Sequence, residues 1–412
     1  MAAQRPPIAI IFLTVLISMV GFGIVIPVLP VYAKQPPFVL SPAQLGWLVG
    51  VFSLIQLVAA PLFGKLSDRI GRKPVLLVSV FGTALGFFII GRADAAWMLF
   101  LGRIIDGASG GNIATAQACI ADVTPPEGRS KAMGILGAAF GLGFVAGPAL
   151  GGVLASYSTS TPFYVAGVLS LLNAALIWVR LPETFPAEKR MQNRGEAALG
   201  EVFRGTQSGF IGLLVVASLL STTGFAFIHV LFALFCGDHF NWSLRETSYA
   251  FAYVGVLAVL VQGGLLRRLL RRNIEKQLAL AGASILAVSL YWLPRVGSVS
   301  AFLASCALMA LGNGLLTPTL AGMASRFVSE SAQGRVMGLM SAAGSLARFL
   351  GPSLAVLSFP ANFSELSRPL EAEVLAGIKL AYERAFSFGA LLVALSLLCI
   401  VFLSTPKSQN AG

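Results

Sequence analysis

Long apolar runs, separated by short polar segments, recur along the whole chain of 412 residues. A helix that crosses a membrane needs about 20 apolar residues in a row. The runs are continuous rather than alternating, which excludes a closed barrel of strands and leaves helices to satisfy the backbone inside lipid. The pattern therefore predicts an all-α membrane protein with twelve transmembrane helices, over residues 8–33, 43–63, 75–93, 97–121, 133–156, 161–181, 209–235, 247–266, 277–294, 300–325, 336–358 and 379–404.

A polar segment of mixed charge, residues 182–208, divides these spans into two sets of six. We interpret it as a cytoplasmic linker between an N-terminal bundle (1–181) and a C-terminal bundle (209–412). An internal repeat supports this division, because residues 133–148 resemble residues 337–352 at a constant offset of 204 (337 − 133). Such repeats build transporters from two pseudo-symmetric bundles with a site near the membrane midplane.

Composition and charge agree with a membrane protein. The chain is 56% hydrophobic and only 11% charged, whereas about a quarter of the residues in a soluble domain are charged. A net charge of +12 could indicate nucleic-acid binding, but most of the 29 basic residues fall in every second loop. The positive-inside rule then places both termini in the cytoplasm and predicts a protein of the plasma (inner) membrane with no nucleic-acid partner.

The sequence offers little for catalysis or metal binding. Its four cysteines, Cys119, Cys236, Cys306 and Cys399, lie far apart and show no metal or disulfide spacing. No nucleophile–base pair and no phosphate-binding loop stands out. The first apolar run lacks a cleavage site and is expected to remain as a helix. We therefore expect neither an enzyme nor a bound cofactor or metal, and a protein that functions as a monomer with a small-molecule substrate, protons and the lipid bilayer as partners.

Residues 97–121 carry two charges where charges are costly. Arg103 and Asp106 are three residues apart, and Asp106 lies about ten residues into the span, near the midplane. An ion there costs from about 2.5 kcal/mol upwards. On a continuous helix Gly107, Gly110 and Gln117 would share their face. Two interpretations stay open: a neutralised intrahelical pair that orients the helix, or a site for a proton or a substrate charge.

Other polar residues within the spans are candidates for a substrate cavity. Weakly polar stripes of this kind suit a wet lining and interhelical hydrogen bonds equally well. His229 could titrate near neutral pH or could be structural. Arg348, halfway along its span, could bind an anion, pair with an acid or line an interface. The full set is Ser18, Gln56, Gln117, Phe225, His229, Gln262, Asn313 and Arg348.

The polar stretch of residues 64–73 is too charged for lipid and too short for a domain, so we expect a tight turn between two spans. Its glycines, Gly64 and Gly71, permit close approach of backbone segments. The pattern of Gly64, Asp68, Arg69, Gly71 and Arg72 resembles the loop between helices 2 and 3 of the major facilitator superfamily. The resemblance implies a conformational latch, in which Asp122, at the end of residues 97–121, pairs with Arg69 or Arg72.

The fifth span carries small residues every four positions, at Gly143, Gly147 and Gly151, followed by Gly152. This spacing lets helices touch backbone to backbone. Together with Pro148, the run also resembles a signature of the superfamily's drug/proton antiporters, which favours export.

A second resemblance concerns proton coupling. Arg103, Asp106 and Gly107 resemble the superfamily's helix-4 motif, whose arginine is associated with proton coupling. Much of the first half resembles tetracycline/proton antiporters, in Gly21–Pro30, Gly64–Leu77, Arg103–Asp122 and Met133–Gly152. Two acids of those exporters are replaced, however, since Ser18 and Gly86 stand at their positions. This leaves Asp106 as the deep carboxylate for protons and argues against tetracycline itself as the substrate.

The sequence thus predicts a secondary active transporter that exports small amphipathic compounds or drugs in exchange for protons, by alternating access. The alternative is a proton-coupled symporter or facilitator of a small metabolite or organic anion. A non-transporting receptor or scaffold is a third hypothesis, which does not explain why costly charges and glycines are present inside the spans.

Overall fold

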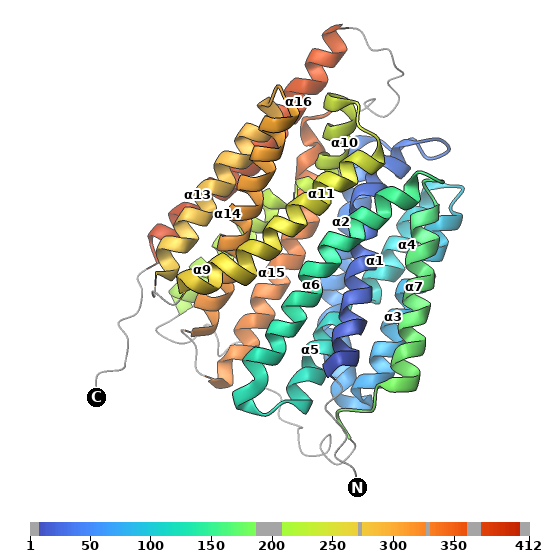
Figure 1. Cartoon of the computed structure of the whole chain (residues 1–412), viewed down its shortest axis with the longest axis vertical. Helices are drawn as coiled ribbons and strands as arrows, with labels where there is room; N and C mark the ends of the chain where they lie inside the picture. The colour runs from blue at the N-terminus through green and yellow to red at the C-terminus, as the bar shows by residue number, and fades with distance from the viewer. Residues whose placement is uncertain (1–7, 187–207, 271–273, 327–329, 361–371, 404–412) are drawn as a thin grey trace. The chain divides into compact units, whose positions relative to one another are not determined.

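The structure of the protein is a computed structural model that describes residues 8–186, 208–270, 274–326, 330–360 and 372–403. Within those residues every regular element is a helix, as the sequence predicts (Figure 1). Contacts group the chain into two compact units.

The first unit comprises Met1–Gly195, His229–Val256 and Phe359–Leu370. Its described helices are α1 (Ile8–Lys34), α2 (Pro42–Ile70), α3 (Arg72–Arg92), α4 (Ala96–Ala108), α5 (Asn112–Val123), α6 (Pro126–Ala155), α7 (Thr161–Arg180), α10 (Ile228–Phe240) and most of α11 (Leu244–Leu260).

The second unit comprises Glu196–Ile228, Leu257–Ser358 and Glu371–Gly412. Its described helices are α9 (Ser208–Phe225), the π-helix η2 (Val261–Leu266), α12 (Arg267–Leu269), α13 (Glu275–Trp292), η4 (Leu293–Arg295), α14 (Val299–Arg326), α15 (Glu330–Ala355), η5 (Val356–Ser358) and α16 (Ala372–Val401). The predicted linker falls mostly outside the described residues, so a division of the chain at 182–208 stays a prediction.

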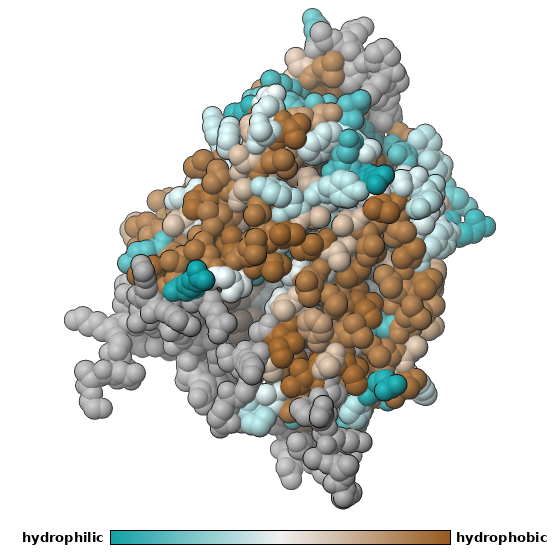
Figure 2. Space-filling model, in the orientation of Figure 1, coloured by the Kyte–Doolittle hydropathy of each residue, from teal (hydrophilic) through white to brown (hydrophobic). Residues whose placement is uncertain are grey.

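The described helices suit a lipid environment. Eleven helical stretches among the described residues, one of which joins α9 and α10, are long and apolar enough to cross a membrane. The remaining predicted span is present as the two shorter helices α4 and α5. Large apolar side chains are exposed on helix surfaces, for example Val58, Val78 and Phe81, each about 60% exposed. Figure 2 shows apolar residues over much of the visible face. Such a surface is costly in water and favourable in hydrocarbon.

The helix predicted over 97–121 is interrupted, which corrects the expectation of one continuous span. Residues Ser109, Gly110 and Gly111 form a tight turn between α4 and α5. Here the Gly110 N–H donates to the Gly107 carbonyl at 3.0 Å, and the Gly111 N–H donates to the Ser109 carbonyl at 2.8 Å. Adjacent glycines have low helix propensity, which favours the break at this point. The single face expected to join Arg103 to Gln117 is therefore not continuous.

The helix predicted over 209–235 is also interrupted. The helix α9 ends at Phe225, and α10 begins at Ile228. Phe225 and His229, both expected within this one span, therefore lie on two different helices.

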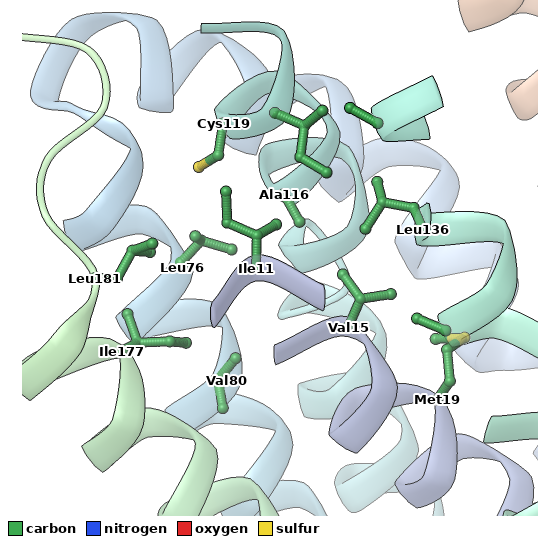
Figure 3. Close-up of a cluster of buried hydrophobic side chains, with 13 residues drawn as sticks. Ile11, Val15, Met19, Leu76, Val80, Ala116, Cys119, Leu136, Ile177 and Leu181 are labelled. Atoms are coloured by element: carbon green, nitrogen blue, oxygen red, sulfur yellow. The ribbon is translucent and has the colours of Figure 1, made fainter. Parts of the chain in front are cut away.

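A buried apolar cluster holds the first unit together. It combines Ile11 and Val15 of α1 with Leu76 of α3, Leu136 of α6 and Ile177 of α7, all at most 2% exposed (Figure 3). Burial of each such side chain contributes about 1.5–3 kcal/mol relative to exposure in water. Within lipid the advantage of this cluster is tight packing, because the surrounding solvent is equally apolar.

Glycines set the closest helix contacts in both units. In the first unit, a Cβ added to Gly147 of α6 would lie 2.7 Å from the Gly23 Cα and from the Val20 carbonyl oxygen of α1. In the second unit, a Cβ added to Gly351 of α15 would lie 2.6 Å from the Ala226 Cβ and 2.8 Å from the Thr223 carbonyl oxygen. The sequence repeat therefore reflects one helix-packing arrangement that is built twice, which is the pseudo-symmetry of the fold.

Candidate functional site

Arg103 and Asp106 form a buried ion pair in the first unit. The Arg103 Nη1 atom lies 3.0 Å from the Asp106 Oδ2 atom, and the residues are 3% and 4% exposed. Arg103 Nε is buried and has no hydrogen-bond partner within the described residues. The pair therefore satisfies only part of its hydrogen-bonding capacity, although an uncompensated polar group in such a place is costly.

Two neighbours of this pair could not be recognised from the sequence. The Phe52 ring of α2 lies against Arg103, with its centroid 4.5 Å from the guanidinium carbon. Thr83 of α3 makes a side-chain hydrogen bond to Asp106. A helix-spacing argument applies only within one helix, and these contacts come from two others. Arg103 and Asp106 are thus held by a cation–π contact and a hydroxyl from α2 and α3.

Gly86 explains why an acid is absent from this position of α3. A Cβ added at Gly86 would lie 2.7 Å from the Gly102 carbonyl oxygen and 3.2 Å from the Asp106 Cβ. The backbone of α4 therefore leaves no room for a side chain at position 86. The glycine on α3 permits this close approach of α4, with Asp106 beside the contact.

The break between α4 and α5 is supported by polar side chains of two other helices. Gln56 of α2 donates from Nε2 to the Gly110 carbonyl at 3.1 Å, and the Ser79 hydroxyl of α3 donates to the Ser109 carbonyl. Irregular backbone at membrane depth requires such partners. Gln56, a cavity candidate, is thus engaged with the backbone next to the Arg103–Asp106 pair.

Ser18 also takes part in interhelical hydrogen bonds. Its hydroxyl accepts from Asn112 Nδ2 of α5 at 3.1 Å and from Asn173 Nδ2 of α7 at 3.3 Å. Asn173 also donates to the Thr14 carbonyl at 3.0 Å. Ser18 thus takes part in a half-buried hydrogen-bond network that links α1, α5 and α7, and its use as a cavity residue stays a prediction.

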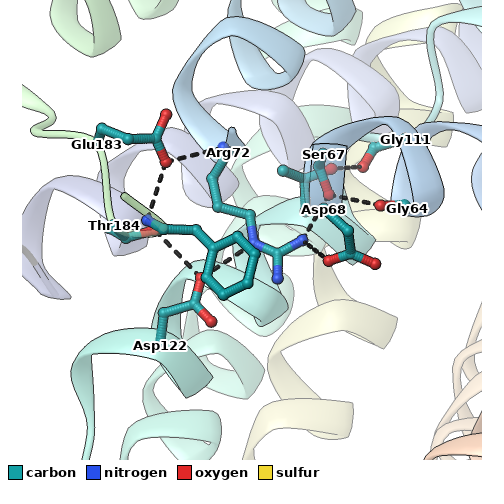
Figure 4. A network of polar contacts seen from close by, with 10 residues as sticks. Gly64, Ser67, Asp68, Arg72, Gly111, Asp122, Glu183 and Thr184 are labelled. Carbon is teal, nitrogen blue, oxygen red and sulfur yellow. Dashed lines mark hydrogen bonds and ion pairs between the residues drawn. The ribbon is translucent and has the colours of Figure 1, made fainter. Parts of the chain in front are cut away.

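The predicted latch residues meet at the end of α2. Arg72 Nη1 lies 2.6 Å from Asp68 Oδ1, and Arg72 Nε lies 3.0 Å from Asp122 Oδ2 (Figure 4). Of the two cations considered for Asp122, the structure selects Arg72, whereas Arg69 is exposed and forms no ion pair with a described residue. One guanidinium therefore connects the end of α2 to the end of α5.

The turn itself is shorter than the sequence suggests. Helix α2 continues to Ile70, and Gly71 alone joins it to α3 at a φ of 108°, a conformation that favours glycine. Gly64 lies inside α2, and no atom within 4 Å would meet a side chain there. The expected close approach at Gly64 is therefore absent; its carbonyl accepts from the Ser67 hydroxyl at 2.8 Å.

The segment after α7 completes the latch, although no local signal in the sequence indicates this. Glu183 accepts from the backbone N–H groups of Arg72 at 2.9 Å and Lys73 at 3.2 Å, where a carboxylate is favourable for a helix N-terminus. The Phe185 ring centroid lies 4.7 Å from the Arg72 guanidinium carbon, and Thr184 donates to Asp122 at 3.4 Å. Figure 4 shows Glu183 and Asp122 both in contact with Arg72, and Thr184 beside Asp122.

The predicted small residues of the fifth span lie against other helices of the first unit. Gly147 and Pro148 face Gly23 of α1, and a Cβ at Gly151 would lie 2.8 Å from the Ile24 carbonyl oxygen. Gly143 is buried against α1 as well, and Gly152 approaches the start of α11. These residues act as packing surfaces in this structure.

The remaining candidates are dispersed. Gln117 and Gln262 are both exposed at their helix surfaces, and the Thr317 hydroxyl donates to Asn313 Oδ1 at 3.0 Å within α14. Phe225 and His229 are half-buried, on α9 and α10. Arg348 is half-buried on α15, and it donates to the Ser345 hydroxyl at 3.0 Å. Within the described residues, no cluster of three His, Cys, Asp or Glu side chains could hold a metal ion.

Comparison with known proteins agrees with this architecture. The sequence model of the Major Facilitator Superfamily matches residues 11–352. The class C tetracycline resistance protein of Escherichia coli is 33% identical over 359 residues, which are 85% of this chain and 89% of that protein. The crystal structure of the human organic anion transporter MFSD10 (TETRAN) has a TM-score of 0.71 at 22% identity, covering 97% of this chain and 100% of that one. The crystal structure of a bacterial homologue of the human lysosomal transporter Spinster, in an inward-facing and occupied conformation, has a TM-score of 0.79 at 14% identity. It covers 97% of this chain and 97% of that one.

A helical fold with many apolar spans, built from two similar packing units, is that of a polytopic membrane protein. The match over residues 11–352 then places the chain in one family: it belongs to the Major Facilitator Superfamily. Its curated relatives include tetracycline resistance proteins.

Proposed function

We propose that the protein exports small amphipathic compounds from the cytoplasm in exchange for protons, by alternating access, and that it functions as a monomer in the plasma (inner) membrane with both termini cytoplasmic. The observation that carries this proposal is the buried Arg103–Asp106 pair. The similarity to the tetracycline resistance protein of Escherichia coli supports the direction of transport.

In this mechanism Asp106 carries the proton. Its 3.0 Å contact to Arg103 stabilises the charged carboxylate, and the burial of both groups opposes charge. Protonation of Asp106 leaves Arg103 without its counter-ion and frees the guanidinium for a new partner. Proton binding and the arrangement of Arg103 are thereby coupled, and Phe52 and Thr83 act as positioning residues.

We further propose that Asp68, Arg72 and Asp122 form a latch that stabilises one access state, together with Glu183. The latch holds the ends of α2, α3 and α5 and the segment after α7 in one arrangement through a single guanidinium. Because its members lie at one end of the helices, we assign them no contact with the substrate. The glycines of α6 provide the close contact along which α1 and α6 can slide.

The direction of proton movement tests the proposed function. We would reconstitute the purified protein in liposomes that contain a pH-sensitive dye and impose a substrate gradient without a proton gradient. Lipophilic cations, tetracyclines and aromatic organic acids would be screened as substrates. Antiport predicts proton movement opposite to the substrate; movement in the same direction would identify a symporter, and flux without proton movement would identify a facilitator.

The second candidate is a symporter or facilitator of a small metabolite or organic anion. The similarity in fold to the human organic anion transporter MFSD10 is the observation that favours it. The same liposome experiment separates the two candidates.

The latch makes its own prediction. Asp68→Asn and Glu183→Gln are expected to lower the turnover rate while changing the apparent substrate affinity less than about twofold, because both residues affect the stability of one access state. Initial rates at a series of substrate concentrations would measure this, with the exposed Glu373→Gln as a matched control. A defect in affinity alone would contradict the latch.

A further inference from the structure

Arg348 is a cation near the middle of a membrane span. The apolar stretch Val336–Ser358 contains it, about 18 Å along the helix axis from one end and about 15 Å from the other at 1.5 Å per residue. Among the described residues its polar contact is the 3.0 Å hydrogen bond to the Ser345 hydroxyl, and no carboxylate pairs with it. Arg348 therefore differs from Arg103, which has Asp106.

This position is incompatible with lipid. A guanidinium has five N–H donors, and Arg348 forms one hydrogen bond to the described part of the chain. If the Arg348 guanidinium faced hydrocarbon at this depth, the cost would be at least about 2.5–3.5 kcal/mol. The half-buried side chain is therefore expected to face a hydrated space that a ligand can enter. Gly344, four residues before it on the same face of α15, has no side chain, and the Arg348 Nη1 atom would lie 3.3 Å from a Cβ built there.

The internal repeat shows what stands at the corresponding place in the first unit. The contacts of Gly147 and Gly351 relate α6 to α15 by 204 residues (351 − 147). The same contacts relate Gly23 to Ala226, and Val20 to Thr223, by 203 residues (226 − 23 and 223 − 20).

Arg348 then corresponds to Phe144, and Phe225 corresponds to Phe22. In the first unit these rings touch: Phe22 and Phe144 pack edge to face at 5.9 Å between centroids. Phe22 also lies 5.7 Å from Phe52, the ring that covers Arg103. Phe144 thus packs against Phe22, on the side of the ring that leads to Phe52, while part of its own side chain is exposed. By the repeat, Arg348 occupies the equivalent position on α15, with Phe225 at the position of Phe22.

We propose that Arg348 and Phe225 form a substrate subsite for the oxyanion of an aromatic organic acid, a carboxylate or sulfonate. A guanidinium matches two such oxygens with parallel hydrogen bonds. Ser345 holds one side of the guanidinium, and the Phe225 ring receives the apolar body of the ligand. The inference rests on the proposed transport function and holds for either direction of proton movement.

A matched pair of dyes tests the subsite without a gradient. Fluorescein and rhodamine 123 share a xanthene ring system, but fluorescein is an anion and rhodamine 123 a cation. Binding to the purified protein in lipid nanodiscs would be measured by fluorescence anisotropy. Because no transport step is involved, the result is independent of the liposome experiment, and a failure of either proposal is visible separately.

Arg348→Gln is expected to weaken fluorescein binding by about tenfold or more and to leave rhodamine 123 binding unchanged or tighter. Arg348→Lys, which keeps the charge but loses the planar fork, is expected to be intermediate. The exposed Arg268→Gln serves as the control and is expected to match the wild type. Unchanged fluorescein binding in Arg348→Gln, an equal loss of both dyes, or a wild-type protein that does not bind fluorescein would overturn the proposal.

Discussion

Asp106→Asn is expected to abolish proton-driven accumulation of substrate. A one-for-one antiporter concentrates substrate about tenfold for each pH unit of gradient, since one pH unit is equivalent to about 1.36 kcal/mol. The amide that replaces the carboxylate in this variant cannot bind and release a proton. The ratio of substrate concentrations on the two sides of the membrane is therefore expected to fall to about one. Accumulation in liposomes at a fixed pH gradient measures this ratio, and gradient-free exchange of labelled substrate is expected to persist.

Two further variants separate coupling from folding. Asp94→Asn changes an exposed aspartate just before α4 and is expected to behave like the wild type. Arg103→Gln leaves Asp106 buried without its partner, which destabilises proteins by about 3–5 kcal/mol when the acid stays charged. Combining Arg103→Gln with Asp106→Asn is expected to recover thermal stability but not coupling. Unchanged accumulation in Asp106→Asn would show that the pair is structural.

Gly147→Ala is expected to reduce the yield of folded protein severely. The added methyl would lie 2.7 Å from the Gly23 Cα and the Val20 carbonyl oxygen, which are backbone atoms and cannot move aside by a rotamer change. Overpacking of this kind costs about 1–3 kcal/mol, and we expect the upper end because two backbones must separate.

Gly137 of the same helix is the matched control. No atom lies within 4 Å of a Cβ built there. Since alanine is favoured over glycine in a helix interior by about 1 kcal/mol, Gly137→Ala is expected to be neutral or stabilising. Size-exclusion profiles and melting temperatures of the two variants would therefore shift in opposite directions. Equal behaviour would mean that α1 and α6 do not approach as closely as the structure indicates.

Much of the fold was predictable because hydropathy is a property of each segment by itself. Each apolar run must satisfy its own backbone hydrogen bonds inside lipid, so the runs alone predict a helical membrane protein. The four-residue spacing of glycines likewise predicts a close helix contact, since it depends on one helix face. The interruption at residues 109–111 was missed because hydropathy does not report hydrogen-bond partners from other helices. Here side chains of α2 and α3 bind the backbone carbonyls of the broken turn.

The candidate site divides in the same way. Arg103 and Asp106 could be paired from the sequence because they stand three residues apart on one helix. The contacts of Phe52 and Thr83 with this pair come from helices that are distant in sequence. Glu183 lay in a segment that composition marked only as a connection, although its carboxylate caps α3 beside the latch.

The amino-acid sequence alone is enough to infer the class of the protein, its helical spans, the repeat and the charged residues inside the membrane. All of these follow from local spacing and from the cost of charge in lipid. The choice of Arg72 rather than Arg69 as the partner of Asp122 emerges only when the helices are packed together. The same is true of the close approach of α4 that excludes a side chain at position 86. Both depend on distances between helices, which are set by side-chain packing along the full length of both partners and cannot be calculated from either helix alone.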